Sequence, residues 1–221
     1  MGSTHYELHS TTRPALEKMR AHKASYEVRV LGITITVLPG VWSPAYDWSG
    51  IFMIANFPDV KGKDVLEIGC GSGLISVHAA LSGARHVTAV DINPIAVENT
   101  RLNFSKFEID FGSAHVSNGF AEVAGDFDVV VFNAPYHGCR PGDMLEYACA
   151  DEDYQSLRAF FSDVRTHLRP DGLVELGFSE SGDLKLFRSL IELHRFGIRR
   201  ELSDWREGYN CMFFELSPEA D

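Results

Sequence analysis

A glycine-rich turn constrains the fold of this chain more than any other feature. An apolar run, Val65–Ile68, leads directly into the turn, and an apolar helical pattern begins at Leu74. The glycines of the turn are Gly69, Gly71 and Gly73. Glycines let the backbone approach a ligand closely at the carboxyl end of a strand, which is where open α/β sheets bind ligands. We therefore expect an α/β domain with a ligand site at this turn.

The spacing of these glycines argues against a dinucleotide site. The dinucleotide pattern G-x-G-x-x-G requires a third glycine where this chain has Leu74. Glu67, two residues before the first glycine, adds a carboxylate that a pyrophosphate would avoid and an ammonium group would prefer. Cys70, within the turn, is expected to be a small packing residue rather than a nucleophile. The turn therefore favours a ligand that carries an amine.

Short β-rich runs alternate with helical segments after residue 63, which is the pattern of a parallel sheet covered by helices. Seven strands are expected, at residues 64–68, 86–91, 114–117, 128–132, 173–178, 197–202 and 210–216. Helices are expected at residues 74–82, 94–103, 153–168 and 183–193. The predicted fold is α/β: a Rossmann-like, seven-stranded, mostly parallel sheet with helices on both faces.

The first 60 residues predict a small helix and a hairpin that extend this domain. Thr12 is expected to cap a helix that has Pro14 in its first turn and ends near Lys23. Residues 26–31 and 33–38 alternate around Gly32, which indicates the hairpin. We expect residues 1–60 to form a cap that faces the substrate and residues 61–221 to form the main domain.

An acidic residue ends the second strand of that domain. Asp91 follows Gly71 by twenty residues, and a carboxylate at this place can accept hydrogen bonds from both hydroxyls of a ribose. Asn93 and Pro94 then begin a helix. The run from Val65 to Asn103 resembles the class I S-adenosylmethionine-dependent methyltransferases, whose first two motifs are E/D-x-G-x-G-x-G and an acidic ribose-binding residue at the end of the second strand.

This resemblance implies S-adenosylmethionine as the cofactor. It implies that the cofactor is bound by Glu67, Gly69, Cys70, Gly71, Gly73, Asp91 and Ile92. It also implies that the adenine edge is met after the third strand, by Asn118, Gly119 and Phe120. Members of the family often have an acidic residue where this chain has Asn118.

A second motif follows the fourth strand. The segment Asn133-Ala134-Pro135-Tyr136 is similar to the N-P-P-Y/F motif of nitrogen-modifying methyltransferases, such as the HemK/PrmC-type glutamine methyltransferases and the guanine-N2 methyltransferases of ribosomal RNA. In that family the Asn oxygen and the next carbonyl accept the two N–H bonds of a substrate NH2, and the aromatic ring packs on its flat face. The resemblance implies catalytic roles for Asn133, Pro135 and Tyr136, with Asn133 also beside the cofactor. Ala134 departs from the motif, which leaves its carbonyl less firmly oriented.

The resemblance extends to a segment before the glycine-rich turn. Residues 41–49, VWSPAYDWS, look like the V-Y/F-x-P-x-x-D-T/S segment that lies over the cofactor in HemK-type enzymes. Residues 1–38 resemble no known module, and they are too short for the helical domain with which bacterial release-factor methyltransferases hold their substrate.

Charge and cysteine usage exclude several classes of protein. The formal net charge is -11, which argues against nucleic acid as a partner. The four cysteines are scattered without a C-x-x-C pair, so neither a metal site nor a disulfide framework is expected. No apolar run is long enough to span a membrane, and no signal peptide is evident, so we expect a cytoplasmic protein.

The leading interpretation is an N-methyltransferase that acts on an amine or amide nitrogen of a small molecule or a protein side chain. One alternative keeps the cofactor but not the transfer: the α-amine of S-adenosylmethionine attacks its own γ-carbon, giving azetidine-2-carboxylate and methylthioadenosine. A ribosomal RNA guanine-N2 methyltransferase and a non-catalytic binding protein of the same fold are further alternatives. The identity of the acceptor and the oligomeric state stay open.

Overall fold

The β-rich runs after residue 63 assemble into one sheet. The structure is a computed structural model that describes residue 8 and residues 10–206 and 208–219. The strand order is β5-β4-β3-β6-β7-β9-β8. The strands are β3 (Asp64–Ile68), β4 (His86–Asp91), β5 (Gly112–Val116), β6 (Phe127–Asn133), β7 (Leu168–Ser179), β8 (Phe196–Arg206) and β9 (Tyr209–Pro218). Strands β3 to β7 run parallel, and β9 pairs antiparallel with β7 and β8, so the expected mostly parallel sheet is confirmed.

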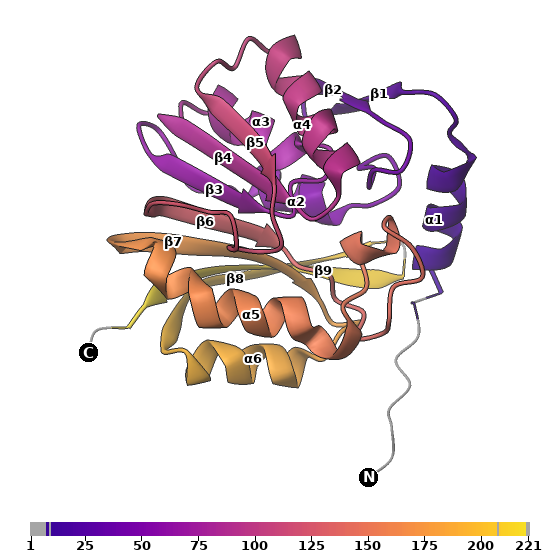
Figure 1. Cartoon of the computed structure of the whole chain (residues 1–221). Coiled ribbons are helices and arrows are strands. Elements are labelled where there is room, and N and C mark those ends of the chain that lie inside the picture. The colour runs from indigo at the N-terminus through magenta and orange to yellow at the C-terminus, as the bar shows by residue number, and fades with distance from the viewer. Residues whose placement is uncertain (1–7, 9, 207, 220–221) are drawn as a thin grey trace.

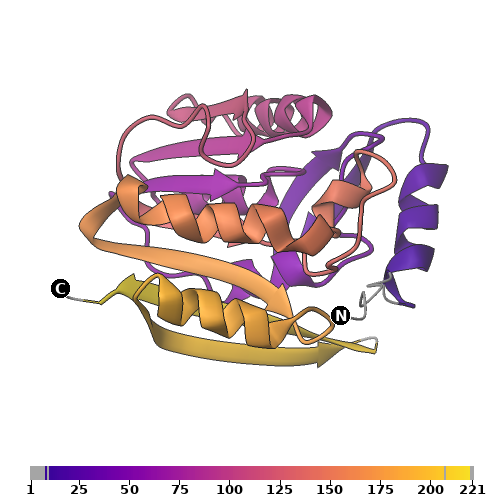
Figure 2. The ribbon, with the colours of Figure 1, turned by 60° about the horizontal axis from the view of Figure 1, so that its bottom comes forward.

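Helices cover both faces of this sheet, as Figure 1 and Figure 2 show. One face carries α2 (Ser49–Ala55), α3 (Leu74–Leu81) and α4 (Pro94–Lys106); the other carries α5 (Gln155–Asp163) and α6 (Leu184–Leu193). Because successive side chains of a strand point to opposite faces, Val65 joins the core beneath α3 whereas Leu66 joins the core beneath α5. The alternation along each strand thus produces two hydrophobic layers. Single 3-10 turns are η1 (Glu146–Ala148), η2 (Glu152–Tyr154) and η3 (Val164–His167).

The expected hairpin is formed by β1 (Tyr26–Val30) and β2 (Ile33–Val37). Its two-residue turn places Leu31 at φ 46° and Gly32 at φ 89°, and positive φ at both positions matches the twist of a tight hairpin. Two buried asparagines of α4, four residues apart, hold β2: Oδ1 of Asn99 accepts from the Leu38 N–H, and Oδ1 of Asn103 accepts from the Thr36 N–H. The hairpin is therefore fixed to the helix that follows Asp91.

The role expected for Thr12 as a helix cap is wrong. Helix α1 (Thr12–Ala21) begins at Thr12, and Thr11 before it makes no side-chain capping bond. The buried Thr12 hydroxyl instead lies 2.9 Å from Nε2 of His137, in the loop after β6. The Thr12 hydroxyl therefore bonds to a residue 125 positions away instead of capping its own helix.

Strand β7 begins five residues earlier than expected, at Leu168. Residues 168–172, LRPDG, carry turn-forming and charged side chains, so their sequence does not indicate a strand. Arg169 draws them into the sheet because its guanidinium bonds to Asp64 of β3 and Asp128 of β6, at 2.5 Å each.

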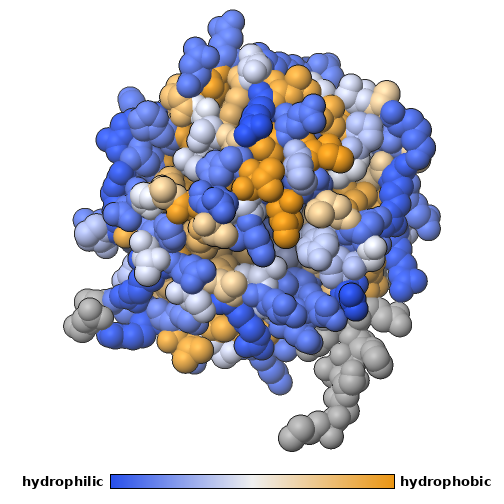
Figure 3. All heavy atoms as spheres, in the orientation of Figure 1, coloured by the Kyte–Doolittle hydropathy of each residue, from blue (hydrophilic) through white to orange (hydrophobic). Residues whose placement is uncertain are grey.

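No helix among the described residues is long and apolar enough to cross a membrane. The face in Figure 3 is mainly hydrophilic, with apolar side chains gathered near its middle.

Candidate active site

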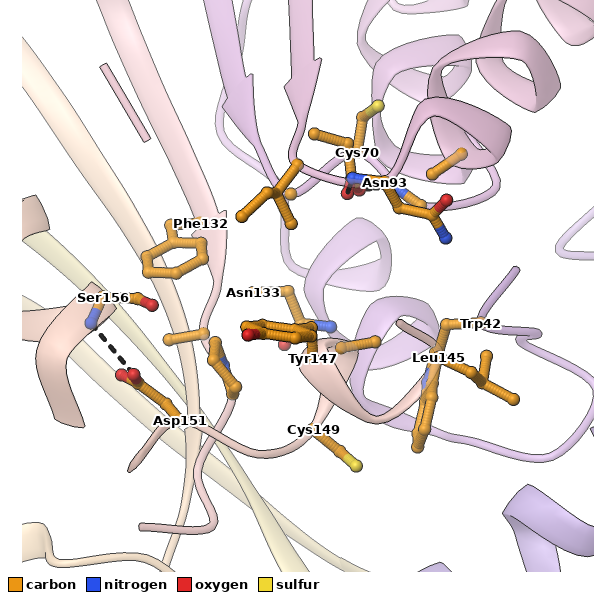
Figure 4. Close-up of a pocket in the computed structure, with 18 of the residues that line it drawn as sticks. Trp42, Cys70, Asn93, Phe132, Asn133, Leu145, Tyr147, Cys149, Asp151 and Ser156 are labelled. Carbon is orange, nitrogen blue, oxygen red and sulfur yellow. Dashed lines mark hydrogen bonds between the residues drawn. The ribbon is translucent and has the colours of Figure 1, made fainter. Parts of the chain in front are cut away.

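A cavity of about 600 Å³ lies at the carboxyl ends of β3, β4 and β6. It is lined by most of the residues that the sequence predicts: Glu67, Gly69, Cys70, Gly71, Asp91, Ile92, Asn118, Gly119, Asn133, Pro135 and Tyr136. Gly73 and Phe120 do not line it. Figure 4 shows Cys70 and Asn93 at one side of this cavity and Asn133 and Tyr147 further along it. The two motifs, about sixty residues apart in the sequence, therefore share one cavity.

Gly73 contributes to the site through packing. It has φ 78° at the start of α3, and a Cβ atom there would lie 2.9 Å from Oγ1 of Thr100 on α4. A side chain at this position would force α4 away from the turn. The glycine therefore keeps the turn and α4 in contact, although it does not face the cavity.

Asp91 holds the glycine-rich turn through its carboxylate. Oδ2 of Asp91 accepts from the Gly71 N–H at 2.9 Å, and Oδ1 accepts from the Asn93 N–H at 2.8 Å. Burial raises the pKa of Asp91, and these bonds to the backbone oppose that rise. A carboxylate has about four lone-pair sites, so these two hydrogen bonds do not use its whole capacity. This remaining capacity fits the two hydroxyls of a ribose.

Glu67 and Cys70 lie in the buried floor of the cavity. Ser76 of α3 donates a hydrogen bond to Oε2 of Glu67, and burial raises the pKa of Glu67 to about 8. A nearby ammonium group would lower that pKa by favouring the charged carboxylate. Burial also raises the pKa of the Cys70 thiol, and Oγ1 of Thr100 donates to its sulfur. A protonated, buried thiol is a poor nucleophile, so Cys70 acts in packing.

The residues after β5 divide between cavity and core. Asn118 and Gly119 line the cavity. Phe120 is 7% exposed, and its ring stacks on His167 with 4.8 Å between the centroids. It also contacts Phe160 of α5. Phe120 thus supports the loop from beneath, because its apolar ring is better buried against α5 than exposed in the cavity.

Asn133 is held by residues at the start of α2. Its Nδ2 donates to Oγ of Ser49 at 2.9 Å, and Ser49 in turn donates to Oδ2 of Asp47. The hydroxyl of Tyr209 on β9 donates to the other oxygen of Asp47 at 3.0 Å. Both Asp47 and Ser49 line the cavity. The segment 41–49 therefore contacts the second motif directly.

The backbone of Ala134 is fixed although the motif's first proline is missing. The Ala134 N–H donates to the carbonyl of Gly177 on β7 at 3.1 Å. Ala134 also precedes Pro135, and a residue before proline is restricted to extended backbone conformations. Both constraints orient the Ala134 carbonyl.

Gly177 is a site residue that the sequence analysis missed. A Cβ atom at this position would lie 2.4 Å from Oδ1 of Asn133 and 2.7 Å from Sδ of Met53. Only glycine leaves room for the Asn133 side chain. A glycine inside a strand often marks such a close approach, and Gly177 within the apolar run 173–178 carries that signal.

The loop after β6 lines the far end of the cavity, and helix α1 packs on this loop. Leu16 and Met19 of α1 pack on Leu145, Cys149 and Ala150 of the loop, with Trp42 and Tyr46 beside them. Arg20 bonds to Asp143 at 2.7 Å and to Glu146 at 2.6 Å. Figure 4 shows Trp42, Leu145, Tyr147 and Cys149 gathered at this end. Tyr136 is buried beside them, and its burial raises the pKa of the phenol.

The described residues contain no cluster of side chains suited to a metal ion.

Known proteins share both the sequence and the fold. The family model of the methyltransferase small domain matches residues 32–181. A candidate protein N5-glutamine methyltransferase of Methanocaldococcus jannaschii is 35% identical over 162 residues, which covers 67% of this chain and 77% of that protein. Ribosomal RNA small subunit methyltransferase C of an Enterobacter species is 38% identical over 120 residues. That alignment covers 53% of this chain and 34% of the relative, so this chain spans about a third of it.

Solved structures have the same fold at lower identity. A Thermus thermophilus 16S rRNA N2 methyltransferase, solved in complex with AdoMet and guanosine, superposes with a TM-score of 0.65 at 22% identity and covers 86% of this chain and 50% of that chain. The ribosomal protein L11 methylase of Lactobacillus delbrueckii subsp. bulgaricus superposes with a TM-score of 0.61 at 20% identity, covering 77% of each chain. The chain belongs to the methyltransferase small domain family, and it is a class I S-adenosylmethionine-dependent methyltransferase of the HemK-like type.

Proposed function

We propose that this methyltransferase modifies a planar NH2 nitrogen, and that its acceptor is the side-chain amide of a glutamine in a protein. The observation that carries the proposal is the fixed Asn133 side chain at the carboxyl end of β6, which lines the cavity, has its Nδ2 bound to Ser49 and has an Oδ1 without a hydrogen-bond partner among the described residues. The likeness to a candidate N5-glutamine methyltransferase supports the same chemistry.

The residues of the site have a positioning task. S-adenosylmethionine, when bound, supplies a methyl group on a sulfonium, which is an excellent leaving group. In our proposal Oδ1 of Asn133 and the Ala134 carbonyl accept the two N–H bonds of the acceptor, and Tyr136 packs on its flat face. Held in this way, the nitrogen lone pair points along the line of transfer. Good alignment can contribute on the order of 7–11 kcal/mol to lowering the barrier.

Two features favour a protein acceptor over RNA. The net charge of -11 repels a polyanion. The first 60 residues carry equal numbers of acidic and basic residues, so all of this excess charge lies in residues 61–221, which contain most of the cavity lining. A guanine NH2 is nevertheless planar like an amide NH2, and the experiment must therefore include it.

The test is a set of acceptors incubated with the full chain and S-adenosylmethionine. The set contains a peptide with one glutamine, the same peptide with glutamate in its place, guanosine, and no acceptor. We expect S-adenosylhomocysteine and a methylated glutamine peptide by mass spectrometry, and no methyl group on the glutamate peptide.

Two results would contradict the proposal. Methylation of guanosine but not of the glutamine peptide would mean that the acceptor is a nucleobase and not a side-chain amide. Methylthioadenosine that accumulates above the enzyme-free control without any acceptor would indicate the cyclase alternative.

A further inference from the structure

A chain of hydrogen bonds links Asn133 to a carboxylate outside the N-x-P-Y motif. It runs from Nδ2 of Asn133 to Oγ of Ser49 and from there to Asp47. The Ser49 N–H also donates to Oδ2 of Asp47, at 3.1 Å. The chain joins the end of β6 to the first residue of α2 and to Asp47 just before it.

The chemistry of these groups permits one direction for the chain. A carboxylate only accepts hydrogen bonds, so the single Ser49 proton is committed to Asp47. The Ser49 oxygen can then only accept from Asn133, which requires the NH2 end of the amide to face Ser49. The oxygen end of Asn133 then lies beside Gly177 of β7, and it has no hydrogen-bond partner among the residues that the structure describes.

The other end of the chain is fixed in the same way. The backbone N–H of Trp48 donates to the Tyr209 hydroxyl at 3.1 Å, and this hydroxyl in turn donates its proton to Asp47. Nε1 of Trp48 donates to Asp204 of β8 at 2.9 Å, and the Arg206 guanidinium lies 3.6 Å from the centre of the Trp48 ring. Neither the serine nor the tyrosine can therefore reverse its bond without losing a partner.

We propose that Asp47 and Ser49 are positioning residues that set the polarity of the Asn133 amide and thereby select acceptors that donate N–H bonds. This inference rests on the proposed function, because it concerns the same acceptor site. If the amide reversed, it would present an NH2 group to the acceptor NH2, and two donors would face each other. A ring nitrogen that carries no hydrogen is excluded by the native site for a similar reason. It can only accept a hydrogen bond, and the site offers it only carbonyl oxygens, which also accept.

The first test compares an isosteric variant with a control. Asp47→Asn can donate a hydrogen bond, so it no longer forces the Ser49 proton away from Asn133. We expect kcat for the glutamine peptide to fall about 100-fold, as for a misplaced reacting group. The dissociation constant of S-adenosylhomocysteine, measured by calorimetry, should stay unchanged. Asp59→Asn, which removes an exposed carboxylate, is the matched control and should retain kcat.

A pair of serine variants separates positioning from folding. Ser49→Ala should lose kcat like Asp47→Asn, whereas Ser49→Thr keeps the hydroxyl and should restore most of it. Full kcat in both Asp47→Asn and Ser49→Ala, with a wild-type enzyme that methylates the peptide, would overturn the positioning role and leave the proposed function intact.

Nuclear magnetic resonance tests the chain without any acceptor. The NH2 signals of Asn133 are assigned by their absence from the side-chain amide spectrum of Asn133→Ala. We expect slow solvent exchange for the NH2 proton that faces Ser49, and fast exchange in Ser49→Ala and Asp47→Asn. Equal exchange rates in wild type, Ser49→Ala and Asp47→Asn would overturn the inference. Failure to methylate any acceptor in the set, by contrast, would count only against the proposed function.

Discussion

At the scale of single residues, the site depends on the absence of one side chain as much as on the presence of others. Asn133 fits against β7 because Gly177 has no Cβ atom. The sequence motif predicts Asn133, but its contact with Ser49 spans 84 residues and its contact with Gly177 spans 44. Such partners follow from the strand register and from the place where α2 begins. Pattern reading along the chain does not provide either of them.

Gly177→Ala tests this fit. The added methyl group would overlap Oδ1 of Asn133, so the amide must shift from its place. We expect kcat to fall by about 100-fold, the cost of a displacement near 1 Å, while S-adenosylhomocysteine still binds. Gly197→Ala on β8 is the control, because the nearest atom to its added Cβ lies 3.8 Å away. Equal turnover in the two variants would show that Asn133 does not need this space.

At the scale of elements, most of the fold follows from local pattern. The strands that end at Ile68, Asp91 and Asn133 are short apolar runs followed by turn or cap residues, so their positions are predictable. The start of β7 is not, because the ion pairs of Arg169 with two other strands override a turn-like sequence. The position of α1 is not predictable either: its apolar side packs on the loop after β6, which periodicity cannot identify.

The packing of α1 makes a prediction about acceptor binding. Leu16 is 1% exposed and contacts the loop that lines the far end of the cavity. Leu16→Ala should lower the free energy of unfolding by about 2–5 kcal/mol. Because the loop loses its support, KM for the glutamine peptide should rise more than KM for S-adenosylmethionine. Glu17→Ala, exposed on the same helix, should change neither. An unchanged peptide KM in a folded Leu16→Ala enzyme would remove the helix from acceptor binding.

At the scale of the whole molecule, a buried pair of acids makes stability depend on pH. Glu175 of β7 is fully buried, both of its carboxyl oxygens lack a hydrogen-bond partner among the described residues, and Glu215 is its neighbour on β9. Burial, and then the charge of Glu215, raise the pKa of Glu175 from 4.5 to about 9. Arg200 bonds to Glu215 and to the Asn56 carbonyl just after α2, so this pair lies beneath the helix that begins at Ser49.

The direction of the pH effect follows from the proton that the folded state keeps. Between pH 4.5 and 9 Glu175 is protonated when folded and ionised when unfolded, so its contribution to stability is complete below pH 4.5 and is lost as the pH rises toward 9. The slope for one such group approaches about 1.4 kcal/mol per pH unit. Glu67, with a pKa of about 8, adds a loss of the same sign.

Denaturant unfolding of Glu175→Gln from pH 5 to pH 9 measures this contribution. The glutamine cannot ionise, so the variant should lose much of the slope and keep the part due to Glu67. Glu180→Gln, an exposed change nearby, should keep the wild-type slope. Identical slopes in wild type and Glu175→Gln would show that Glu175 does not retain its proton in the folded state.

The central claim is that Asn133 holds the nitrogen that receives the methyl group. The most direct measurement is single-turnover methyl transfer to the glutamine peptide by wild type and Asn133→Ala, with calorimetry of S-adenosylhomocysteine on both. We predict that the variant nearly loses transfer while its affinity for S-adenosylhomocysteine changes little, since the bonds removed act on the acceptor. Full transfer by Asn133→Ala would contradict the account.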